Sequence, residues 1–169
     1  MPVLSGNDIR RLIKASPPLV EGCVDVNAQV QPNGIDLTLR DISAIKSQGQ
    51  IAVDNKRRIL PDLSPLPFNA DGFIDLAAGS YIVTYNEVVH LPKNVMALGR
   101  PRSSLLRCGV DVGTAVWDAG YEGRSQSLLM VHNPLGFRLE KNARIMQLVF
   151  MELTGESEGY NGIYQNENT

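Results

Sequence analysis

The chain has 169 residues and a formal net charge of −2, a length that fits one domain with a sizeable core. Hydrophobic residues make up 43% and charged residues 20%, as in ordinary globular proteins, and no apolar run approaches the ~20 residues of a membrane span. The weakly acidic charge argues against a polyanion-binding protein. The N-terminus lacks a signal region, so a cytoplasmic protein is expected.

The two cysteines, Cys23 and Cys108, lie far apart and lack the Cys-x-x-Cys or Cys/His spacing of a metal site. We interpret them as free thiols of a reducing compartment that behave as small hydrophobic side chains. The sequence therefore argues against a disulfide-stapled fold and against zinc-dependent chemistry.

A short amphipathic helix is predicted over residues 6–15. Ser5 can cap its first amides while Asp8 reaches back, close to a capping box. Pro17 and Pro18 end the helix because proline has no amide hydrogen to donate. Residues 35–40 then alternate between apolar and polar side chains, which predicts a half-buried strand.

The rest of the chain reads as short strands separated by turns rich in Gly, Pro and Asn. Apolar runs of strand length occur at residues 73–76, 81–85, 95–98, 127–131 and 145–153. This pattern predicts an all-β barrel or sandwich, within a single domain over residues 1–154. Residues 48–69 are polar and contain proline, which predicts a loop with a weak strand. Residues 155–169, rich in Gly, Asn and Glu, predict a mobile tail.

The densest candidate for ligand binding is the basic segment Arg102-Ser103-Ser104-Leu105-Leu106-Arg107. Its two adjacent hydroxyls and its guanidinium groups can hydrogen-bond to phosphate oxygens. From Arg100 to Arg144 there are seven basic and four acidic residues, which suits a small phosphorylated ligand better than a nucleic acid. The structural alternative is a basic turn leading into a helix.

Asp118 is the candidate catalytic base. It follows an apolar run and precedes a Gly-rich turn, which places a carboxylate at the mouth of a strand pair. There it can take a proton from water and direct the hydroxide at phosphorus. Tyr121 can lay its ring against a sugar or base. An aspartate that only caps a turn beside a core tryptophan is the alternative.

Gln147 and the tail tyrosines are further candidates. Gln147 is the single polar residue in the run from Ile145 to Met151, and a buried amide needs a partner in protein, water or ligand. Tyr160 and Tyr164 lie among glycines, which suggests an arm that becomes ordered over a ligand. A satisfied structural glutamine and a plain disordered terminus are the alternatives.

Taken in order, these segments resemble the motifs of the dUTPase and dCTP deaminase superfamily, most of all its archaeal-type dUTPases. The resemblance runs from about Leu4 to Gln165. The matching segments are Leu4–Ile9, Gln31–Leu37, Arg102–Arg107, Trp117–Gly123, Arg144–Phe150 and Tyr160–Gln165. Several motifs in a compatible order are more specific than any one alone, and together they favour ligand binding over the structural alternatives.

The resemblance implies a mainly β fold, a distorted jelly-roll β-barrel of the dUTPase type with a short N-terminal helix. It also implies a homotrimer with three sites between subunits, dUTP as substrate without nucleic-acid or membrane partners, and Mg²⁺ held mainly through the triphosphate. In the implied roles Asp118 orients the attacking water, Tyr121 packs on the deoxyribose, and the tail closes the site. The implied substrate-binding residues are Arg102, Ser103, Ser104, Arg107, Tyr121, Gln147, Tyr160 and Gln165.

The strand after the third motif separates the two activities of the superfamily. Its deaminases carry a glutamate there as general acid and base, whereas counting from Gly123 gives Leu128, or Met130 in a shifted register. No Asp or Glu occurs from Arg124 to Phe137, and losing a general acid/base costs roughly 10²–10⁴ in rate. We therefore expect a dUTP diphosphatase that releases dUMP and pyrophosphate. A mono- or bifunctional dCTP deaminase and a non-catalytic nucleotide sensor remain the alternatives.

Overall fold

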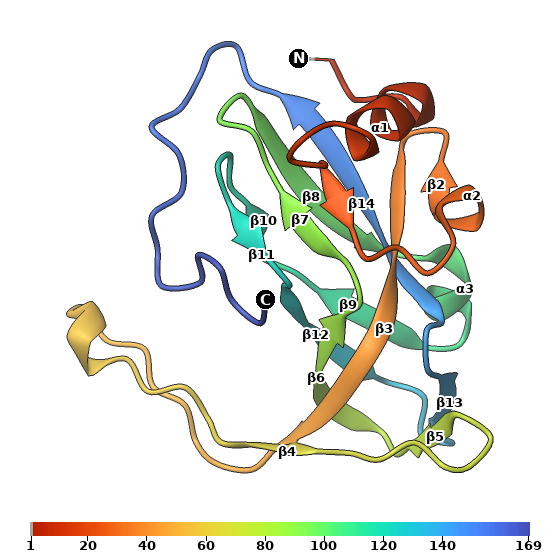
Figure 1. The fold of residues 1–169 in the computed structure, drawn as a ribbon. Helices are drawn as coiled ribbons and strands as arrows, with labels where there is room; N and C mark the ends of the chain where they lie inside the picture. Colours follow the sequence, from red (N-terminus) through yellow and green to blue (C-terminus); the bar gives the residue numbers. More distant parts are fainter. Residues whose placement is uncertain (1) are drawn as a thin grey trace.

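A computed structural model describes residues 2–169, in which short strands curl around one core (Figure 1). The mainly β class and the short N-terminal helix confirm the sequence prediction, and the five predicted apolar runs fall in β5, β6, β8, β12 and β14. No helix within residues 2–169 has the length and apolar character to cross a membrane. The elements in chain order are α1 (Gly6–Ile13), β1 (Val20–Glu21), α2 (Val26–Gln29), β2 (Val30–Gln31), β3 (Gly34–Ile45), the 3₁₀-helix η1 (Asn55–Arg57), β4 (Leu63–Pro65), β5 (Phe73–Leu76), β6 (Gly79–Tyr85), β7 (Val88–His90), β8 (Val95–Pro101), α3 (Ser103–Arg107), β9 (Val110–Gly113), β10 (Val116–Trp117), β11 (Glu122–Gly123), β12 (Gln126–Val131), β13 (Phe137–Glu140) and β14 (Arg144–Glu152).

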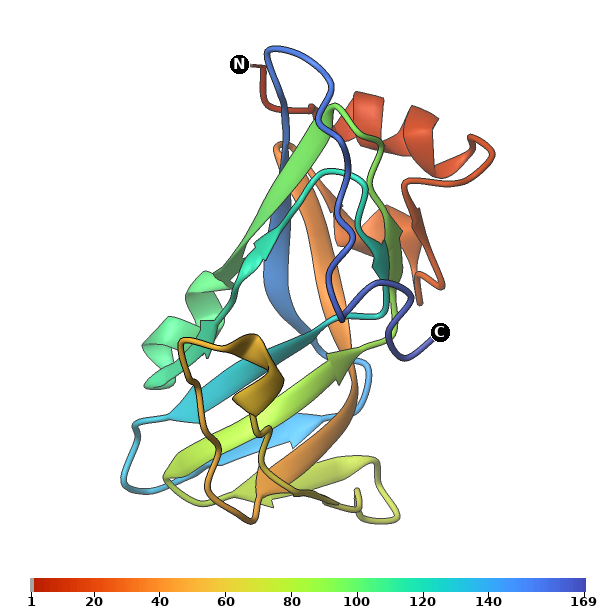
Figure 2. The same cartoon turned by 90° about the vertical axis from the view of Figure 1, so that its left-hand side faces the viewer.

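The strands pair antiparallel, and β3 joins two layers of the fold. The longest path runs β10-β8-β14-β3-β6-β12-β9, with β2 and β4 also paired to β3, while β1-β7-β11 and β5-β13 form smaller sheets. The first residues of β3 pair with β14, and residues 39–44 pair with β6. The register shifts between Leu39 and Asp41. Such an irregularity bends a strand, which lets β3 run the length of the body in both layers (Figure 2).

The N-terminal helix begins as the sequence predicts. The Asp8 amide donates to the Ser5 hydroxyl, and the Ser5 amide donates to the Asp8 carboxylate, which completes the capping box. Ile9 on the inner face of α1 is fully buried. The helix ends at Ile13, two residues before the predicted end.

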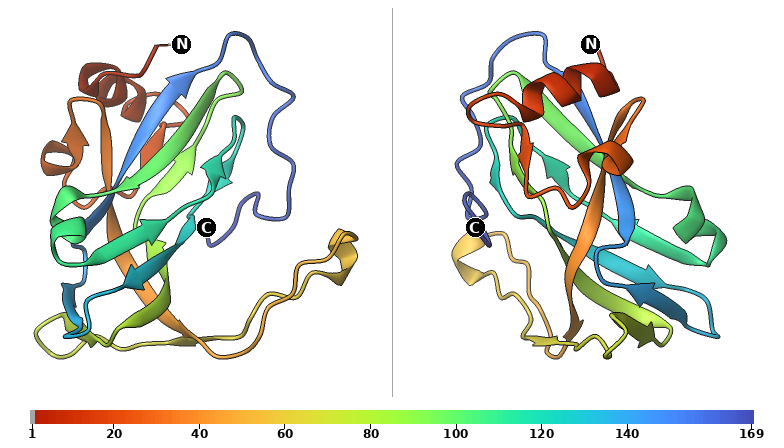
Figure 3. Two further views of the ribbon diagram at one scale, coloured as in Figure 1. Left: turned by 180° about the vertical axis from the view of Figure 1, so that it is seen from behind. Right: turned by 45° about the vertical axis from the view of Figure 1, so that its right-hand side comes forward.

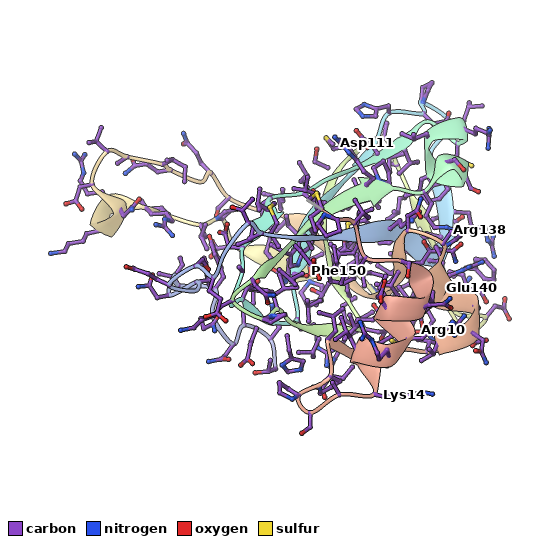
Figure 4. All side chains as sticks on the ribbon, turned by 90° about the horizontal axis from the view of Figure 1, so that it is seen from above. Arg10, Lys14, Asp111, Arg138, Glu140 and Phe150 are labelled. Atoms are coloured by element: carbon purple, nitrogen blue, oxygen red, sulfur yellow. The ribbon has the colours of Figure 1, made fainter. Side chains whose placement is uncertain are left out.

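The core lies between the curled sheets. Ile35, Leu37 and Leu39 of β3 are fully buried together with Leu148 and Phe150 of β14, and Phe150 lies inside the body in Figure 4. Full burial of one such side chain contributes about 1.5–3 kcal/mol, so this central strand pair is a main source of stability.

The prediction of a half-buried strand is wrong for β3, because its polar face is covered as well. Asp36 and Thr38 are each only 1% exposed. The buried carboxylate of Glu87 accepts hydrogen bonds from the amide and hydroxyl of Thr38 at 2.9 and 2.6 Å, and from Nε2 of Gln29 at 2.7 Å. Burial raises the pKa of Glu87, and these donors oppose the rise. A buried polar face on β3 therefore organises the neighbouring segments through hydrogen bonds.

Residues 46–62 form a hairpin arm that projects from the body between β3 and β4 (Figures 1 and 3). The predicted loop excursion is confirmed, with η1 at its tip and the weak strand realised as β4 on its return. The sequence gives no sign that this segment leaves the body.

Candidate active site

A cavity of about 450 Å³ lies beside β10, β12 and the turn that precedes β11. Among the predicted site residues, Asp118, Tyr121 and Tyr160 line it. Strand β12 contributes Gln126, Ser127 and Leu128, and further walls come from β6, β9, the root of the hairpin arm and the tail, residues 155–169. The third motif and the C-terminal motif therefore meet at one hollow.

The tryptophan of the third motif fixes the floor of this cavity. Trp117 is 5% exposed, and its Nε1 donates to the Ser125 hydroxyl at 3.0 Å. Because a buried indole N–H needs an acceptor, this bond ties β10 to the start of β12. The next residue, Asp118, is exposed at the cavity.

The Asp118 carboxylate has no hydrogen-bond donor among the described residues, although its backbone carbonyl accepts from the Tyr121 amide at 3.1 Å. A capping aspartate would accept a backbone amide with its side chain. The geometry therefore does not match the turn-capping alternative.

The tail lies along the third motif of its own chain (Figure 2). The Tyr160 amide donates to the Ala119 carbonyl at 2.8 Å, and the rings of Tyr160 and Tyr121 meet edge to face with centroids 5.8 Å apart. Gln165 makes two bonds to the turn: its Oε1 accepts from the Glu122 amide and its Nε2 donates to the Gly120 carbonyl, both at 3.1 Å. These contacts place Tyr160 and Gln165 beside Tyr121, and the mobility of the tail stays a prediction.

Gly120 is needed for this approach. Its φ is +84°, a conformation that disfavours other residues, and a Cβ there would come within 2.8 Å of the Gly159 Cα. The glycine of the third motif thus accommodates the glycine of the tail.

Glu167 is a cavity residue that the sequence reasoning missed. Its carboxylate accepts a hydrogen bond from the Tyr121 hydroxyl at 2.9 Å, and its backbone carbonyl accepts from the Arg124 amide at 2.9 Å. Burial raises the pKa of Tyr121, and the Glu167 charge adds to that rise, so the phenol remains a hydrogen-bond donor. Burial also raises the pKa of Glu167 itself. The charge of Glu167 and its place beyond Gln165 gave no signal of this role.

A second group of predicted residues lies at α3. Ser103 and Ser104 form its exposed first turn, and Arg107 is exposed in its last turn. Arg102 stands at the N-terminal boundary of the helix, where its Nε lies 3.1 Å from Oδ2 of Asp36. Five of the predicted substrate-binding residues carry donor groups suited to phosphate oxygens. We call them the phosphate-binding cluster: Arg102, Ser103, Ser104, Arg107 and Gln147.

Asp36 positions Arg102, one member of this cluster, through the ion pair with its carboxylate. Its Oδ2 also lies 3.3 Å from Nη1 of Arg144, and its Oδ1 is buried with no partner among residues 2–169. Burial raises the pKa of Asp36, and the two guanidinium groups oppose the rise. The sequence placed Asp36 inside the first motif but assigned it no role.

Gln147 lies on β14 opposite Asp36 and Arg100. It is half-buried, and no described residue hydrogen-bonds to its side-chain amide, which leaves that amide available to a ligand. Gly34 gives it room, since a Cβ at Gly34 would lie 3.0 Å from Nε2 of Gln147.

The two groups are not together within one chain. No member of the phosphate-binding cluster lines the cavity of Asp118. Figures 1 and 3 show α3 on one side of the body, with the tail and the hairpin arm on the other. One chain therefore carries both halves of the predicted site on different faces.

The comparisons with known proteins agree with this fold. The dCTP deaminase-like family model matches residues 3–153. The chain is 56% identical over 170 residues to a "Probable deoxyuridine 5'-triphosphate nucleotidohydrolase" of Methanosarcina mazei, covering 100% of this chain and 99% of that one. It is 48% identical to the protein of the same name from Archaeoglobus fulgidus, covering 99% and 98%.

A solved structure, the 2'-deoxycytidine 5'-triphosphate deaminase from Agrobacterium tumefaciens, superposes with a TM-score of 0.66 at 22% identity. The match covers 88% of this chain and 47% of that chain, so the present chain spans about half its length. This likeness concerns the fold, and it supports the jelly-roll expectation. With a family model over most of its length and full-length relatives near half identity, the chain belongs to the dCTP deaminase-like family.

Proposed function

We propose that the protein is a dUTP diphosphatase that hydrolyses dUTP to dUMP and pyrophosphate. The observation that carries the proposal is the full-length identity of 56% and 48% to archaeal proteins named deoxyuridine 5'-triphosphate nucleotidohydrolase. The arrangement of the cavity and of α3 supports it independently. A cytoplasmic location is part of the proposal, as the site of a free nucleotide substrate.

Asp118 acts as the general base. Its carboxylate is exposed at the cavity and carries no protein hydrogen bond among the described residues, so it is available to a water molecule. A carboxylate that accepts the proton of water directs the oxygen lone pair at the α-phosphorus, and the bond to the pyrophosphate oxygen breaks. Tyr121, fixed by Glu167, packs against the deoxyribose on the wall of the same cavity.

The cavity favours hydrolysis over deamination. Its described lining includes two carboxylates, Asp118 and Glu167. The position at which the family's deaminases carry glutamate is Leu128, which lines the cavity, and the shifted-register candidate is Met130 on the same strand. An apolar wall can enclose a pyrimidine ring but cannot transfer a proton to it. Glu167 is engaged with Tyr121 and therefore belongs to the sugar side of the cavity in this proposal.

The phosphate-binding cluster binds the triphosphate. Ser103 and Ser104 offer hydroxyls at an exposed helix start. Arg102, at the N-terminal boundary of the helix, and Arg107, in its last turn, offer guanidinium groups. Charge-assisted bonds to phosphate oxygens are the strong kind of hydrogen bond. The free amide of Gln147 completes the group.

A homotrimer brings the two halves together. The phosphate-binding cluster and the cavity lie on different faces of one chain. Each complete site therefore needs the phosphate-binding cluster of one subunit and the cavity of another. In this arrangement three copies would create three sites. The tail, which contacts the cavity of its own chain, supplies Tyr160 and Gln165 as its cover.

The metal in this proposal is Mg²⁺ held mainly by the triphosphate. No group of three or more His, Cys, Asp or Glu side chains in residues 2–169 is arranged to hold a metal ion, whereas the hydroxyls and guanidinium groups of α3 suit phosphate oxygens. When bound, the ion neutralises charge on the phosphates and eases departure of pyrophosphate. The chain's own part is to bind, orient and deprotonate.

The test is to incubate the purified protein with Mg²⁺ and, separately, dUTP, dCTP and dTTP, and to resolve the products by chromatography. We expect dUMP and pyrophosphate from dUTP alone. Asp118→Asn should reduce turnover about 10²–10⁴-fold while leaving dUTP binding, measured by calorimetry, nearly unchanged. Uracil nucleotides formed from dCTP would favour the deaminase, and binding without turnover in the wild-type protein would favour a nucleotide sensor.

A further inference from the structure

The tail ends in a turn of defined shape. Asn166 and Asn168 adopt left-handed conformations with φ of +61° and +54°, a region that asparagine tolerates better than most residues. Between them, Glu167 forms a parallel bridge with Gly123 at the end of β11. The Thr169 hydroxyl donates to the Asn166 carbonyl at 3.0 Å. The last residues of the chain are therefore ordered against the third motif (Figure 1).

Arg124, the residue that follows Gly123, is bonded to this turn through its backbone and its side chain. Its amide donates to the Glu167 carbonyl at 2.9 Å, and its Nε donates to the Asn168 carbonyl at 3.1 Å. In return, Nδ2 of Asn168 donates to the Arg124 carbonyl at 3.0 Å. Because Arg124 and Asn168 each donate to the other, the contact fixes the orientation of the tail end as well as its position.

The guanidinium group of Arg124 also bonds to the turn between β6 and β7. Its Nη1 donates to the Tyr85 carbonyl at 3.3 Å and to the Asn86 carbonyl. Asn86 is itself fixed, because its Nδ2 donates to the Thr38 hydroxyl at 2.8 Å and to the Leu39 carbonyl at 3.2 Å. One side chain therefore joins the end of the tail to a turn that is anchored on the buried polar face of β3.

Arginine has the geometry that this bridge requires. Its guanidinium group is a rigid planar fork with several donors and no acceptor, and the partners of the Arg124 side chain are carbonyl oxygens. Lysine carries the same charge as one ammonium group on a flexible stem. A lysine at position 124 would therefore keep the charge without holding the two segments in a fixed relation.

From these contacts we propose that Arg124 is a positioning residue for dUTP turnover, because it holds the end of the tail at the cavity. The inference rests on the proposed function, in which the tail covers the bound nucleotide. Arg124 lies outside the described lining of the cavity, whereas Tyr160, Tyr164 and Glu167 of the tail line it. Arg124 therefore acts on the nucleotide through these three side chains and not by direct contact.

The first experiment compares the steady-state kinetics of the wild-type protein and of Arg124→Lys with dUTP. We expect KM to rise about tenfold, as for the loss of one hydrogen bond from a charged group at the weaker end of its range. The change in kcat should be smaller, because the tail binds substrate and transition state alike. The matched control is Arg138→Lys, at an exposed position on β13, which should match the wild type. An unchanged KM in a folded Arg124→Lys protein would overturn the inference.

A second comparison separates positioning of the tail from a purely structural role in the turn between β6 and β7. In a chain truncated after Glu158, which has no tail end to hold, Arg124→Lys should leave KM equal to that of the truncated parent. A residue that only supports the turn would change KM equally in the full and truncated chains, and this result would contradict the proposal.

A third variant tests the contact from the side of the tail. Asn168→Gly removes the bond from Nδ2 to the Arg124 carbonyl and permits the left-handed φ, while the turn between β6 and β7 keeps its own contacts. It therefore serves even where Arg124→Lys does not fold. We expect KM for dUTP to rise about two- to threefold, as for a weak hydrogen bond. A KM equal to that of the wild type would count against the role of Arg124.

Docking of the tail is measured without nucleotide, from the heteronuclear NOE of residues 159–168. We expect this NOE to fall in Arg124→Lys and in Asn168→Gly and to stay at wild-type values in Arg138→Lys. Wild-type values in both of the first two variants would overturn the inference. A fall in the NOE together with a wild-type protein that does not hydrolyse dUTP would reject the proposed function alone.

Discussion

The Tyr121 hydroxyl donates a 2.9 Å hydrogen bond to the carboxylate of Glu167, which joins the tyrosine of the third motif to the end of the tail. The same tail segment pairs with the backbone of the motif, where Gly123 and Glu167 form a parallel bridge. The side chain proposed to contact the sugar is therefore positioned by the segment proposed to close over it. Closure of the tail and orientation of Tyr121 are one event in this arrangement.

Removing the Glu167 carboxylate should weaken the positioning of both Tyr121 and the tail. We expect Glu167→Ala to raise KM for dUTP about 3–10-fold, in line with a hydrogen bond worth ~1 kcal/mol, with a smaller change in kcat. Glu167→Gln, which keeps an oxygen acceptor for Tyr121, should stay within about twofold of the wild type. Steady-state kinetics checks both. Equal losses in the two variants would mean that the charge matters and the hydrogen bond does not.

Tail docking should also depend on pH. Burial raises the pKa of Glu167 from its ordinary 4.5, against the opposing hydrogen bond from Tyr121. A carboxyl with a higher pKa in the docked tail binds its proton more tightly there, so its contribution is complete below pH 4.5 and is lost as pH rises through the docked-state pKa. We expect the heteronuclear NOE of residues 159–168 to fall over that window in the wild type. In Glu167→Gln, which cannot ionise, the profile should be flatter, and an identical profile would assign the effect to another group.

Asp36 should matter more for triphosphate than for monophosphate. Asp36→Asn removes the charge that fixes Arg102 and Arg144 at 3.1 and 3.3 Å. Because burial raises the pKa of Asp36 and the two remaining guanidinium groups are about one-third exposed, we expect little loss of stability, and the main effect should fall on the positions of the two arginines. Affinity for dUTP should fall more than affinity for dUMP, as measured by calorimetry. Asp75→Asn is the matched control, since Asp75 and Arg138 form an exposed pair at 3.7 Å worth at most about 1 kcal/mol.

The sequence predicts those elements of the fold that depend on residues close together in the chain. The capping box of Ser5 and Asp8 and the apolar runs of β5 and β12 depend on neighbouring residues, so they could be predicted. Strands of two residues, such as β1 and β10, are too short to show a period. Their existence depends on partners that are distant in the chain.

The residues of the candidate site likewise divide into those that local motifs predict and those that depend on distant contacts. Asp118, Tyr121 and Tyr160 could be named from ordered motifs, and they do meet at one cavity. The split between that cavity and α3, however, depends on how the sheets curl. The burial of Asp36 depends on the second layer over β3, which the alternation in residues 35–40 cannot reveal. Glu167 depends on a tail that folds back across the turn at Gly120.

Glu87 provides a test of the buried polar face of β3. Glu87→Ala would leave the amide and hydroxyl of Thr38 and the amide of Gln29 without their acceptor, and we expect a loss of roughly 3–5 kcal/mol in the free energy of unfolding. Urea denaturation at a fixed protein concentration checks this, because assembly contributes to apparent stability. Glu140→Gln, at an exposed position, is the control and should change stability by less than about 0.5 kcal/mol.

The pH dependence of the free energy of unfolding should also depend on Glu87. The pKa of Glu87 is raised from its ordinary 4.5, with burial as the largest cause. Its contribution is therefore complete below pH 4.5 and is lost as pH rises through the folded-state pKa. In Glu87→Gln this component should disappear, leaving a flatter profile over that window. An unchanged profile would mean that the donors of Thr38 and Gln29 hold the carboxyl near its unfolded pKa.

Displacing the tail should separate catalysis from assembly. Truncation after Glu158 removes Tyr160, Gln165 and Glu167 and should lower turnover of dUTP with little effect on oligomeric mass, because the tail contacts the turn of its own chain. Gly120→Ala should reproduce the loss with the tail still present. Its Cβ would stand 2.8 Å from the Gly159 Cα, and its φ of +84° disfavours alanine, a strain of about 1 kcal/mol or more. Gly155→Ala, where a Cβ would meet nothing within 4 Å, is the matched control. If Gly120→Ala keeps full turnover while the truncated chain loses it, the tail acts from a position other than the one in which it lies against Gly120.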